Sequence, residues 1–164
     1  SAGILEWPKS HLDWVRPGIM LYGASPFSGE LGINRGLSPV MALEAPIISI
    51  RRLPRGSRVG YGGTWECPED MDIGVVRCGY GDGYPRRIDS GAYVMVNSQK
   101  SPIVGRVSMD SMTIDLRNIT GVKVGDPVRL WGRGIEIEMV SKWADTIPNE
   151  LLSRLPKRVT RKVL

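Results

Sequence analysis

Glycine and proline separate the short apolar runs of this sequence, and this spacing constrains the fold more than any other feature. The chain of 164 residues contains 20 glycines and 12 prolines, which are spread along its length. Short apolar runs between turn residues are typical of a compact β domain. The length suits one complete domain, so any further segment should belong to another one. We therefore expect a mainly β fold, with a small barrel or a sandwich-like domain.

Eight runs have the composition of strands, and in several of them apolar and polar residues alternate, as a sheet with one buried face requires. The predicted strands cover residues 41–52, 59–61, 73–78, 92–96, 103–107, 112–116, 128–130 and 159–163. Residues 97–100 lie between two of these runs and are expected to form a hairpin turn.

Helices are expected only near the C-terminus. Ile137, Val140 and Ala144 are apolar residues at helical spacing. Pro148 suits the first turn of a second short helix, where its missing N–H costs no helical hydrogen bond.

The first 36 residues have a different pattern from the rest. Arg16 and Gly18 interrupt their apolar residues, and a stretch containing serine, glycine and proline follows. We interpret residues 1–36 as the end of one domain with a linker, and residues 37–164 as a β domain. Because the chain starts at Ser1 rather than at a methionine, we expect it to be part of a longer protein.

Composition argues against several classes of protein. No apolar run reaches the roughly 18 residues of a membrane-spanning helix, and the start lacks the layout of a signal peptide. Cys67, Cys78 and the single His11 provide neither a disulfide framework nor a zinc site, which favours a reducing cytoplasm and no metal. The net charge of +5 permits binding to nucleic acid, but the basic residues are not in one block, so we expect solvated faces.

Common catalytic motifs are missing. The sequence has no Gly-x-Ser-x-Gly nucleophile motif, and His11 lies in a polar stretch that predicts an exposed loop. Residues 79–83 contain three glycines, but their spacing is wrong for a dinucleotide loop and predicts a tight turn between strands.

Five separated segments resemble those of a known family, the alanine racemases. They occur in the same order and at roughly the same intervals as in that family, from Val15 to Val159, so the resemblance covers nearly the whole chain. The segments are VRPGIMLYG, RVGYGGTW, GYGDGYPRR, GRVSMDSMTIDL and NELLSRLPKRV.

The resemblance implies a fold and an activity. In that family pyridoxal phosphate (PLP) is bound in the mouth of an eight-stranded α/β barrel, and the β domain of the other subunit of a head-to-tail homodimer completes the site. Residues 1–36 would then be the last part of the PLP-binding barrel, and residues 37–164 the carboxyl-terminal β domain. The implied reaction interconverts L-alanine and D-alanine with two bases and supplies D-alanine for bacterial peptidoglycan.

Tyr61 is the catalytic residue that the resemblance implies. It matches the tyrosine that takes the α-proton of L-alanine in the site of the partner subunit. A phenol must lose its own proton before it acts as a base, and adjacent positive charge favours that loss. On spacing alone, the alternative is a packed strand aromatic flanked by turn glycines.

Four residues near the start of the chain match positions that contact the cofactor. Arg16 matches the arginine that faces the pyridine nitrogen, where a fixed cation disfavours protonation of the ring. Gly18 and Ile19 match positions whose backbone N–H groups hold the phosphate, and Ser1 matches a phosphate-binding hydroxyl.

Four further residues match positions that contact or guide the substrate. Met109 matches the residue whose backbone N–H contacts the substrate carboxylate; without the resemblance it would be ordinary core filling. Tyr80, Arg86 and Arg106 match residues along the corridor to the site, where cations would draw in a carboxylate. Asp82 is expected to orient one of them.

The sequence departs from the family in two ways. Asn149 stands where the family usually has a tyrosine near the cofactor phosphate, and asparagine is shorter and provides no aromatic wall. The lysine that binds the cofactor and acts as the base for D-alanine has no counterpart here, so the chain alone is expected to be inactive. The lysines without a matching context are Lys9, Lys100, Lys123, Lys142, Lys157 and Lys162.

Two alternatives remain open at this point. A racemase of broader amino-acid specificity would keep the fold and change the substrate. A basic β-barrel that binds RNA or another protein would use Trp65, Tyr80 and Tyr84 as stacking groups.

Overall fold

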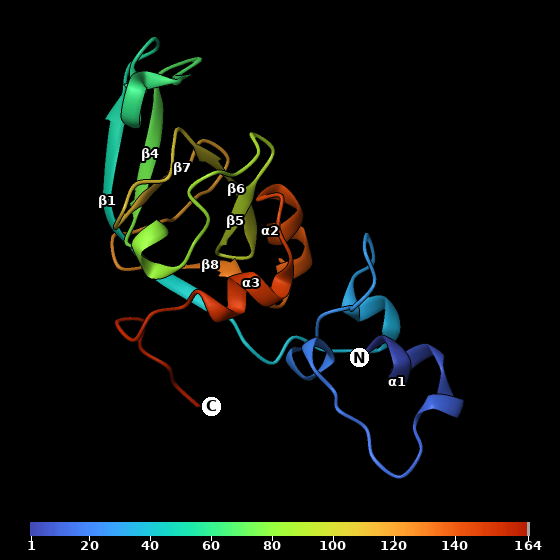
Figure 1. The fold of residues 1–164 in the computed structure, drawn as a ribbon. Coiled ribbons are helices and arrows are strands. Elements are labelled where there is room, and N and C mark those ends of the chain that lie inside the picture. The colour runs from blue at the N-terminus through green and yellow to red at the C-terminus, as the bar shows by residue number, and fades with distance from the viewer. Residues whose placement is uncertain (164) are drawn as a thin grey trace.

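A computed structural model describes residues 1–163 of the chain. Six antiparallel strands form a closed barrel in the order β1-β4-β7-β6-β5-β8, and β8 pairs back to β1 (Figure 1). The strands are β1 (Leu43–Leu53), β4 (Met71–Val76), β5 (Tyr93–Val96), β6 (Gln99–Val104), β7 (Met112–Asp115) and β8 (Pro127–Trp131). The predicted mainly β fold is therefore confirmed, and it takes the form of a barrel.

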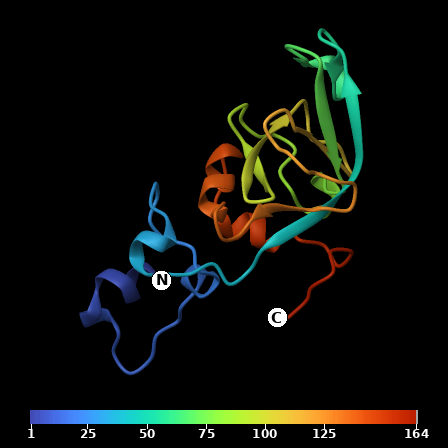
Figure 2. The same ribbon diagram turned by 180° about the vertical axis from the view of Figure 1, so that it is seen from behind.

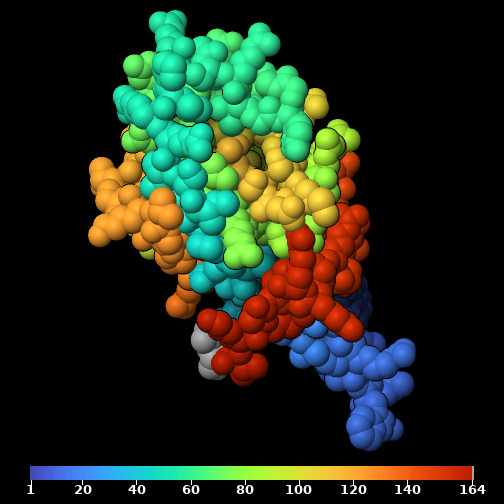
Figure 3. All heavy atoms as spheres, turned by 90° about the vertical axis from the view of Figure 1, so that its left-hand side faces the viewer, coloured from blue at the N-terminus to red at the C-terminus, as the bar shows by residue number. Residues whose placement is uncertain are grey.

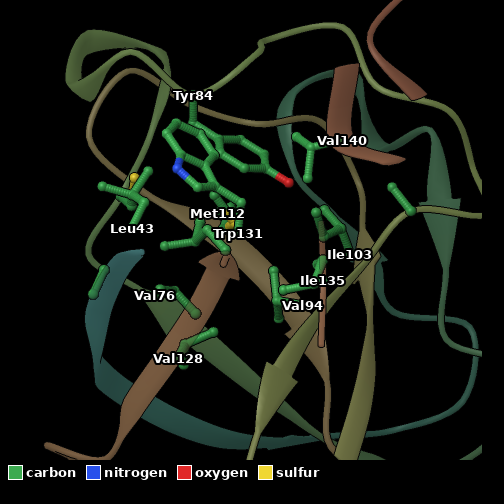
Figure 4. Packing of buried hydrophobic residues seen from close by; sticks show 14 of the residues in the cluster. Leu43, Val76, Tyr84, Val94, Ile103, Met112, Val128, Trp131, Ile135 and Val140 are labelled. Carbon is green, nitrogen blue, oxygen red and sulfur yellow. The ribbon is translucent and has the colours of Figure 1, made fainter. Parts of the chain in front are cut away.

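The barrel encloses a large apolar core. Along the first half of β1 the buried residues are Leu43, Ala45 and Ile47, and exposed residues lie between them. Tyr84 and Trp131 stack inside the barrel with ring centroids 6.2 Å apart (Figure 4). Full burial of a large apolar side chain contributes roughly 1.5–3 kcal/mol, so this core provides a rigid support for the exposed turns around it.

The long strands β1 and β4 carry a small two-stranded ribbon at their far end. In this ribbon β2 (Arg58–Val59) pairs with β3 (Trp65–Glu66). A second apolar cluster joins the ribbon to the barrel and consists of Val59, Cys67, Met71, Ile73 and Val104. The ribbon forms the upper end of the molecule in Figures 1 and 3.

Two short helices occur near the C-terminus, as predicted, and they pack beside the barrel. They are α2 (Ile137–Trp143) and α3 (Pro148–Ser153), and Pro148 lies in the first turn of α3. The expectation that helices occur only there is wrong. The other helices are too short for an apolar period to reveal them. They are α1 (Ala2–Glu6) and the 3-10 helices η1 (Pro8–Ser10), η2 (Ile19–Tyr22), η3 (Gly32–Arg35), η4 (Tyr61–Gly63) and η5 (Tyr80–Asp82).

Two of the predicted strands end early because of glycine. β2 ends at Val59 and β6 ends at Val104. Gly60 and Gly105 follow them with φ angles of 78° and 71°, which lie in the left-handed region that glycine adopts most easily. Tyr61 is consequently in a turn, not in a strand.

The predictions for residues 97–100 and 159–163 need correction. The hairpin turn consists of Asn97 and Ser98 alone, with φ angles of 48° and 62°, as in a two-residue turn. Residues 159–163 form no strand. The six barrel strands already pair with one another in a closed ring, so that sheet offers no free edge to a seventh strand.

Part of the segment before β1 is attached to helix α2. The Glu138 carboxylate on α2 accepts hydrogen bonds from the backbone N–H groups of Ser25 (2.9 Å) and Gly32 (2.7 Å), which fixes this segment to the barrel. Figures 1 and 2 show the start of the chain at the opposite end of the molecule from the β2–β3 ribbon. Among the described residues no helix combines the length and the apolar character needed to cross a membrane.

Candidate functional site

Two turns that carry predicted site residues pack backbone against backbone. Gly60 precedes Tyr61, and Gly105 precedes Arg106. A Cβ atom on Gly60 would stand 2.9 Å from Arg106 N, and one on Gly105 would stand 2.9 Å from Val59 O. Contacts this short leave no room for a side chain at either glycine, so the two turns meet only because both positions are glycine.

Tyr61 projects from this contact. It begins η4, and 68% of its surface is exposed, which excludes the alternative of a packed strand aromatic. The guanidinium of Arg106 lies beside the same turn, because a Cβ on Gly62 would stand 3.6 Å from Arg106 Nη1. The structure therefore brings the candidate base and a candidate corridor cation to neighbouring positions.

Tyr80 and Met109 lie on two turns that are joined by backbone hydrogen bonds. Tyr80 N–H donates to Ser108 O over 3.0 Å, and Gly81 N–H donates to Met109 O over 2.8 Å. Tyr80 is 43% exposed and Met109 is 52% exposed, so Met109 is not core filling. Residues 79–83 form a tight turn between strands, as predicted.

Arg158, which the sequence analysis did not single out, bridges these two turns. Its Nε lies 2.9 Å from Asp82 Oδ1, and its Nη2 lies 2.8 Å from Asp110 Oδ1. The hydrogen bond to Asp110, opposed by partial desolvation, raises the pKa of the Arg158 guanidinium. Within residues 1–163 Asp82 forms its ion pair with Arg158, not with Arg86 or Arg106, and it also accepts a hydrogen bond from Gly79 N–H in the Tyr80 turn, so its expected role in orienting a corridor residue stays a prediction. Asp110 and Arg158 are 48 positions apart in the sequence, so no local pattern reveals the bridge.

A second group of predicted residues gathers near the start of the chain. Ser1 Oγ accepts hydrogen bonds from Gly18 N–H over 3.0 Å and from Met20 N–H over 3.2 Å. Ile19, between these two donors, is buried, and Arg16 is exposed. A hydroxyl with two backbone N–H groups beside it is a donor set that suits the oxygens of a phosphate.

The two groups lie far apart within one chain. Figures 1 and 2 agree in placing the first residues at one end of the molecule and the β2–β3 ribbon, next to Tyr61, at the other. Arg86 is exposed between η5 and β5, and within residues 1–163 no side-chain hydrogen bond or ion pair joins it to either group. A single copy of this fold does not bring Tyr61 to Ser1.

Other candidate residues have structural surroundings that suggest no chemistry. Within the described range no cluster of His, Cys, Asp and Glu side chains is placed to hold a metal. Cys67 and Cys78 are free and buried, and burial raises the pKa of Cys78 to about 12. His11 is partly buried rather than exposed, with Nε2 3.0 Å from Ile4 O. Tyr84 is 1% exposed and is unable to stack on a base, which argues against the RNA-binding alternative.

Asn149 lines an open groove. The groove has a volume of about 900 Å³ and runs between residues 25–31 and the region that contains α2 and the start of α3. The side chain at this position therefore faces space outside the barrel core, where a change of size is accommodated without repacking.

Two family models match the chain, one before β1 and one that includes β1. Residues 40–163 match the model described as "Alanine racemase, C-terminal domain", and residues 1–26 match the one described as "Alanine racemase, N-terminal domain". An alanine racemase from Nitrosococcus oceani is 52% identical over 161 residues, which cover 98% of this chain and 45% of the relative. The chain thus spans less than half the length of that relative.

Solved structures show the same similarity. The alanine racemase from Acinetobacter baumannii superposes with a TM-score of 0.94 at 46% identity, over 99% of this chain and 45% of that protein. The alanine racemase from Bartonella henselae, solved with covalently bound pyridoxal phosphate, has a TM-score of 0.82 at 36% identity, over 92% of this chain and 41% of that protein.

Proposed function

This chain belongs to the alanine racemase family, and on that basis we propose that it forms part of a PLP-dependent enzyme that interconverts L-alanine and D-alanine. Residues 1–36 would be the end of the PLP-binding barrel, and residues 37–164 the carboxyl-terminal β domain. The family-model matches and the position of β1, which begins at Leu43, support this division. The D-alanine would serve peptidoglycan synthesis in the cytoplasm.

The observation that carries the proposal is the separation of the two groups of site residues. Tyr61, Tyr80 and Met109 are exposed, and the β2–β3 ribbon next to Tyr61 lies at one end of the molecule, whereas Ser1 and Gly18 meet near the start of the chain at the other end. Two copies arranged head to tail would place the first group of one copy over the second group of the other. We propose this homodimer as the working form, with each site built from both copies.

The group at the start of the chain would hold the cofactor. Ser1 Oγ and the N–H groups of Gly18 and Ile19 suit the phosphate, and the exposed Arg16 is available to face the pyridine nitrogen. When bound, PLP supplies the electron sink that makes the α-proton of an amino acid acidic. Pyridoxal phosphate is covalently bound in the Bartonella henselae relative, and the same attachment here would use the lysine that the family resemblance implies and that this chain lacks.

Tyr61 would act on the L-face of the substrate. Its phenol oxygen, once ionised, would take the α-proton of L-alanine and return it in the reverse direction. Arg106 Nη1 lies beside the Tyr61 turn, 3.6 Å from where a Cβ on Gly62 would stand. A lysine outside this chain would do the same on the D-face.

The other residues of the first group would bind and guide the substrate. The backbone N–H of Met109 would donate to the substrate carboxylate. Tyr80, Arg86 and Arg106 would line its approach, and both arginines are exposed and free to attract an anion.

Subunit complementation tests this arrangement. The chain is expressed together with its own upstream coding sequence, once with Tyr61→Phe and once with the cofactor-binding lysine changed to alanine. Random mixing of the two inactive variants should restore about a quarter of the wild-type racemisation, because half of the dimers contain one intact site. No recovery on mixing would overturn the two-copy site.

The activity itself is tested with the same longer protein. Conversion of L-alanine to D-alanine in the presence of PLP is expected from it, and none is expected from the 164-residue chain alone. An inactive longer protein, or an active 164-residue chain, would overturn the proposal. Serine racemised as fast as alanine would instead favour the broader racemase.

A further inference from the structure

We infer that Arg158 is a positioning residue, which holds the turn that carries Tyr80 against the turn that carries Met109. The inference rests on the proposed function, because that function makes these turns part of the substrate's path. Arg158 itself lies on the C-terminal tail, which Figure 3 shows in red below the lime-green and yellow segments to which the two turns belong.

The contacts of Arg158 are divided between the two turns. Nε pairs with Asp82 on the Tyr80 turn at 2.9 Å, and Nη2 pairs with Asp110 on the Met109 turn at 2.8 Å. The other oxygen of Asp82 accepts a hydrogen bond from Gly79 N–H at 3.0 Å. Asp82 therefore links the Arg158 guanidinium to the backbone of the Tyr80 turn.

The backbone of the Tyr80 turn also leaves space for the Arg158 guanidinium. A Cβ on Gly81 would stand 2.4 Å from Arg158 Nη2 and 3.0 Å from Met109 O, so only glycine lets the guanidinium lie against this turn. A Cβ on Gly83 would stand 3.0 Å from Arg154 O, which brings the segment after α3 against the same turn. The C-terminal tail therefore begins at a fixed position beside the Tyr80 turn, and this position places Arg158 next to that turn.

Loss of the cation would leave a repulsive pair. Asp82 and Asp110 both direct carboxylate oxygens at the guanidinium, and without it these like charges would lie across the junction between the turns. The hydrogen bonds that Tyr80 N–H and Gly81 N–H donate to the Met109 turn would then break more often. Arginine suits the place because its fork reaches two acceptors at once, whereas lysine offers one point of charge.

The first test measures amide hydrogen exchange in the 164-residue chain. Arg158→Gln should speed the exchange of the Tyr80 and Gly81 amides about fivefold, the effect expected of a partly exposed ion pair. Arg161→Gln is the matched control, since Arg161 lies on the same tail and its contact is to the Leu155 carbonyl, not to a carboxylate. Equal exchange in both variants, or the same acceleration throughout β5, would overturn the inference.

The second test uses the racemase with its upstream sequence. Arg158→Gln should raise KM for L-alanine about fivefold and leave kcat within about twofold, as loss of uniform substrate binding predicts. Arg158→Lys should recover part of the KM change. An unchanged KM in Arg158→Gln would overturn the positioning role. An inactive parent enzyme would overturn the proposed function, and with it the positioning role, while the exchange measurement would still decide whether Arg158 joins the turns.

Discussion

A Cβ atom on Gly79 would stand 2.2 Å from the carbonyl oxygen of Ser108. The backbones of the Tyr80 turn and the Met109 turn thus approach so closely that no side chain fits between them. The same approach allows Tyr80 N–H to donate to Ser108 O at 3.0 Å. Local backbone geometry, more than side-chain packing, sets the relation between these two exposed residues.

Gly79→Ala should therefore separate the two turns. The clash is with backbone atoms, which cannot rotate away, and overpacking of this kind costs about 1–3 kcal/mol of unfolding free energy. Gly91→Ala is the matched control, because a Cβ there meets nothing within 4 Å and φ is not positive. Chemical denaturation measures both changes. The explanation fails if the two variants have the same stability.

Tyr84→Phe should stabilise the chain. The Tyr84 hydroxyl is buried and has no hydrogen-bond partner among the described residues, and such a group costs about 1–3 kcal/mol. Phenylalanine keeps the stack on Trp131 and removes the unpaired oxygen. The midpoint temperature of thermal unfolding should rise for Tyr84→Phe and should change little for the control Tyr22→Phe, since Tyr22 is exposed. A clear loss of stability would reveal a partner for this hydroxyl, such as an internal water.

Alkaline pH should weaken the barrel through Cys78. Burial raises the pKa of this thiol from 9.0 to about 12, so the folded state holds its proton more tightly than the unfolded state does. The resulting stability is complete below pH 9 and is lost as the pH rises through about 12. Over that window each pH unit removes about 1.4 kcal/mol of unfolding free energy.

Cys78→Ala serves as the reference for this pH effect. The difference in unfolding free energy between the wild type and this variant should shrink between about pH 9 and about pH 10. This interval lies below the pH at which most tyrosine side chains lose their proton. Denaturant midpoints at several pH values provide the measurement. Parallel pH profiles for the two proteins would show that Cys78 does not contribute.

The strands were more predictable than the site. Leu43, Ala45 and Ile47 alternate with polar or exposed residues, so the buried face of β1 is visible in the sequence. The prediction failed at residues 159–163, because the composition of a short run does not show whether a sheet has a free edge. Tyr61 and Met109 were found only through the resemblance, since nothing in their spacing marks them as exposed.

The bridge made by Arg158 was invisible for a different reason. Its two carboxylate partners, Asp82 and Asp110, lie on separate turns that meet only after the barrel has closed. The contact of Glu138 with the Ser25 backbone, 113 positions away, is of the same kind. Long-range polar contacts depend on the folded geometry and have no local signature.

Tyr61→Phe in the racemase with its upstream sequence provides the sharpest prediction. The change removes one oxygen from a side chain that is 68% exposed, so folding, dimer formation and PLP binding should be kept. Loss of a positioned base costs about two to four orders of magnitude in rate, and racemisation must slow in both directions because the substrates fix the equilibrium. In deuterated water, exchange of the α-proton of L-alanine should be impaired, while D-alanine should still exchange through the lysine. Tyr22→Phe, at another exposed tyrosine, should exchange both enantiomers normally. If Tyr61→Phe exchanges both equally well, Tyr61 is not the L-specific base.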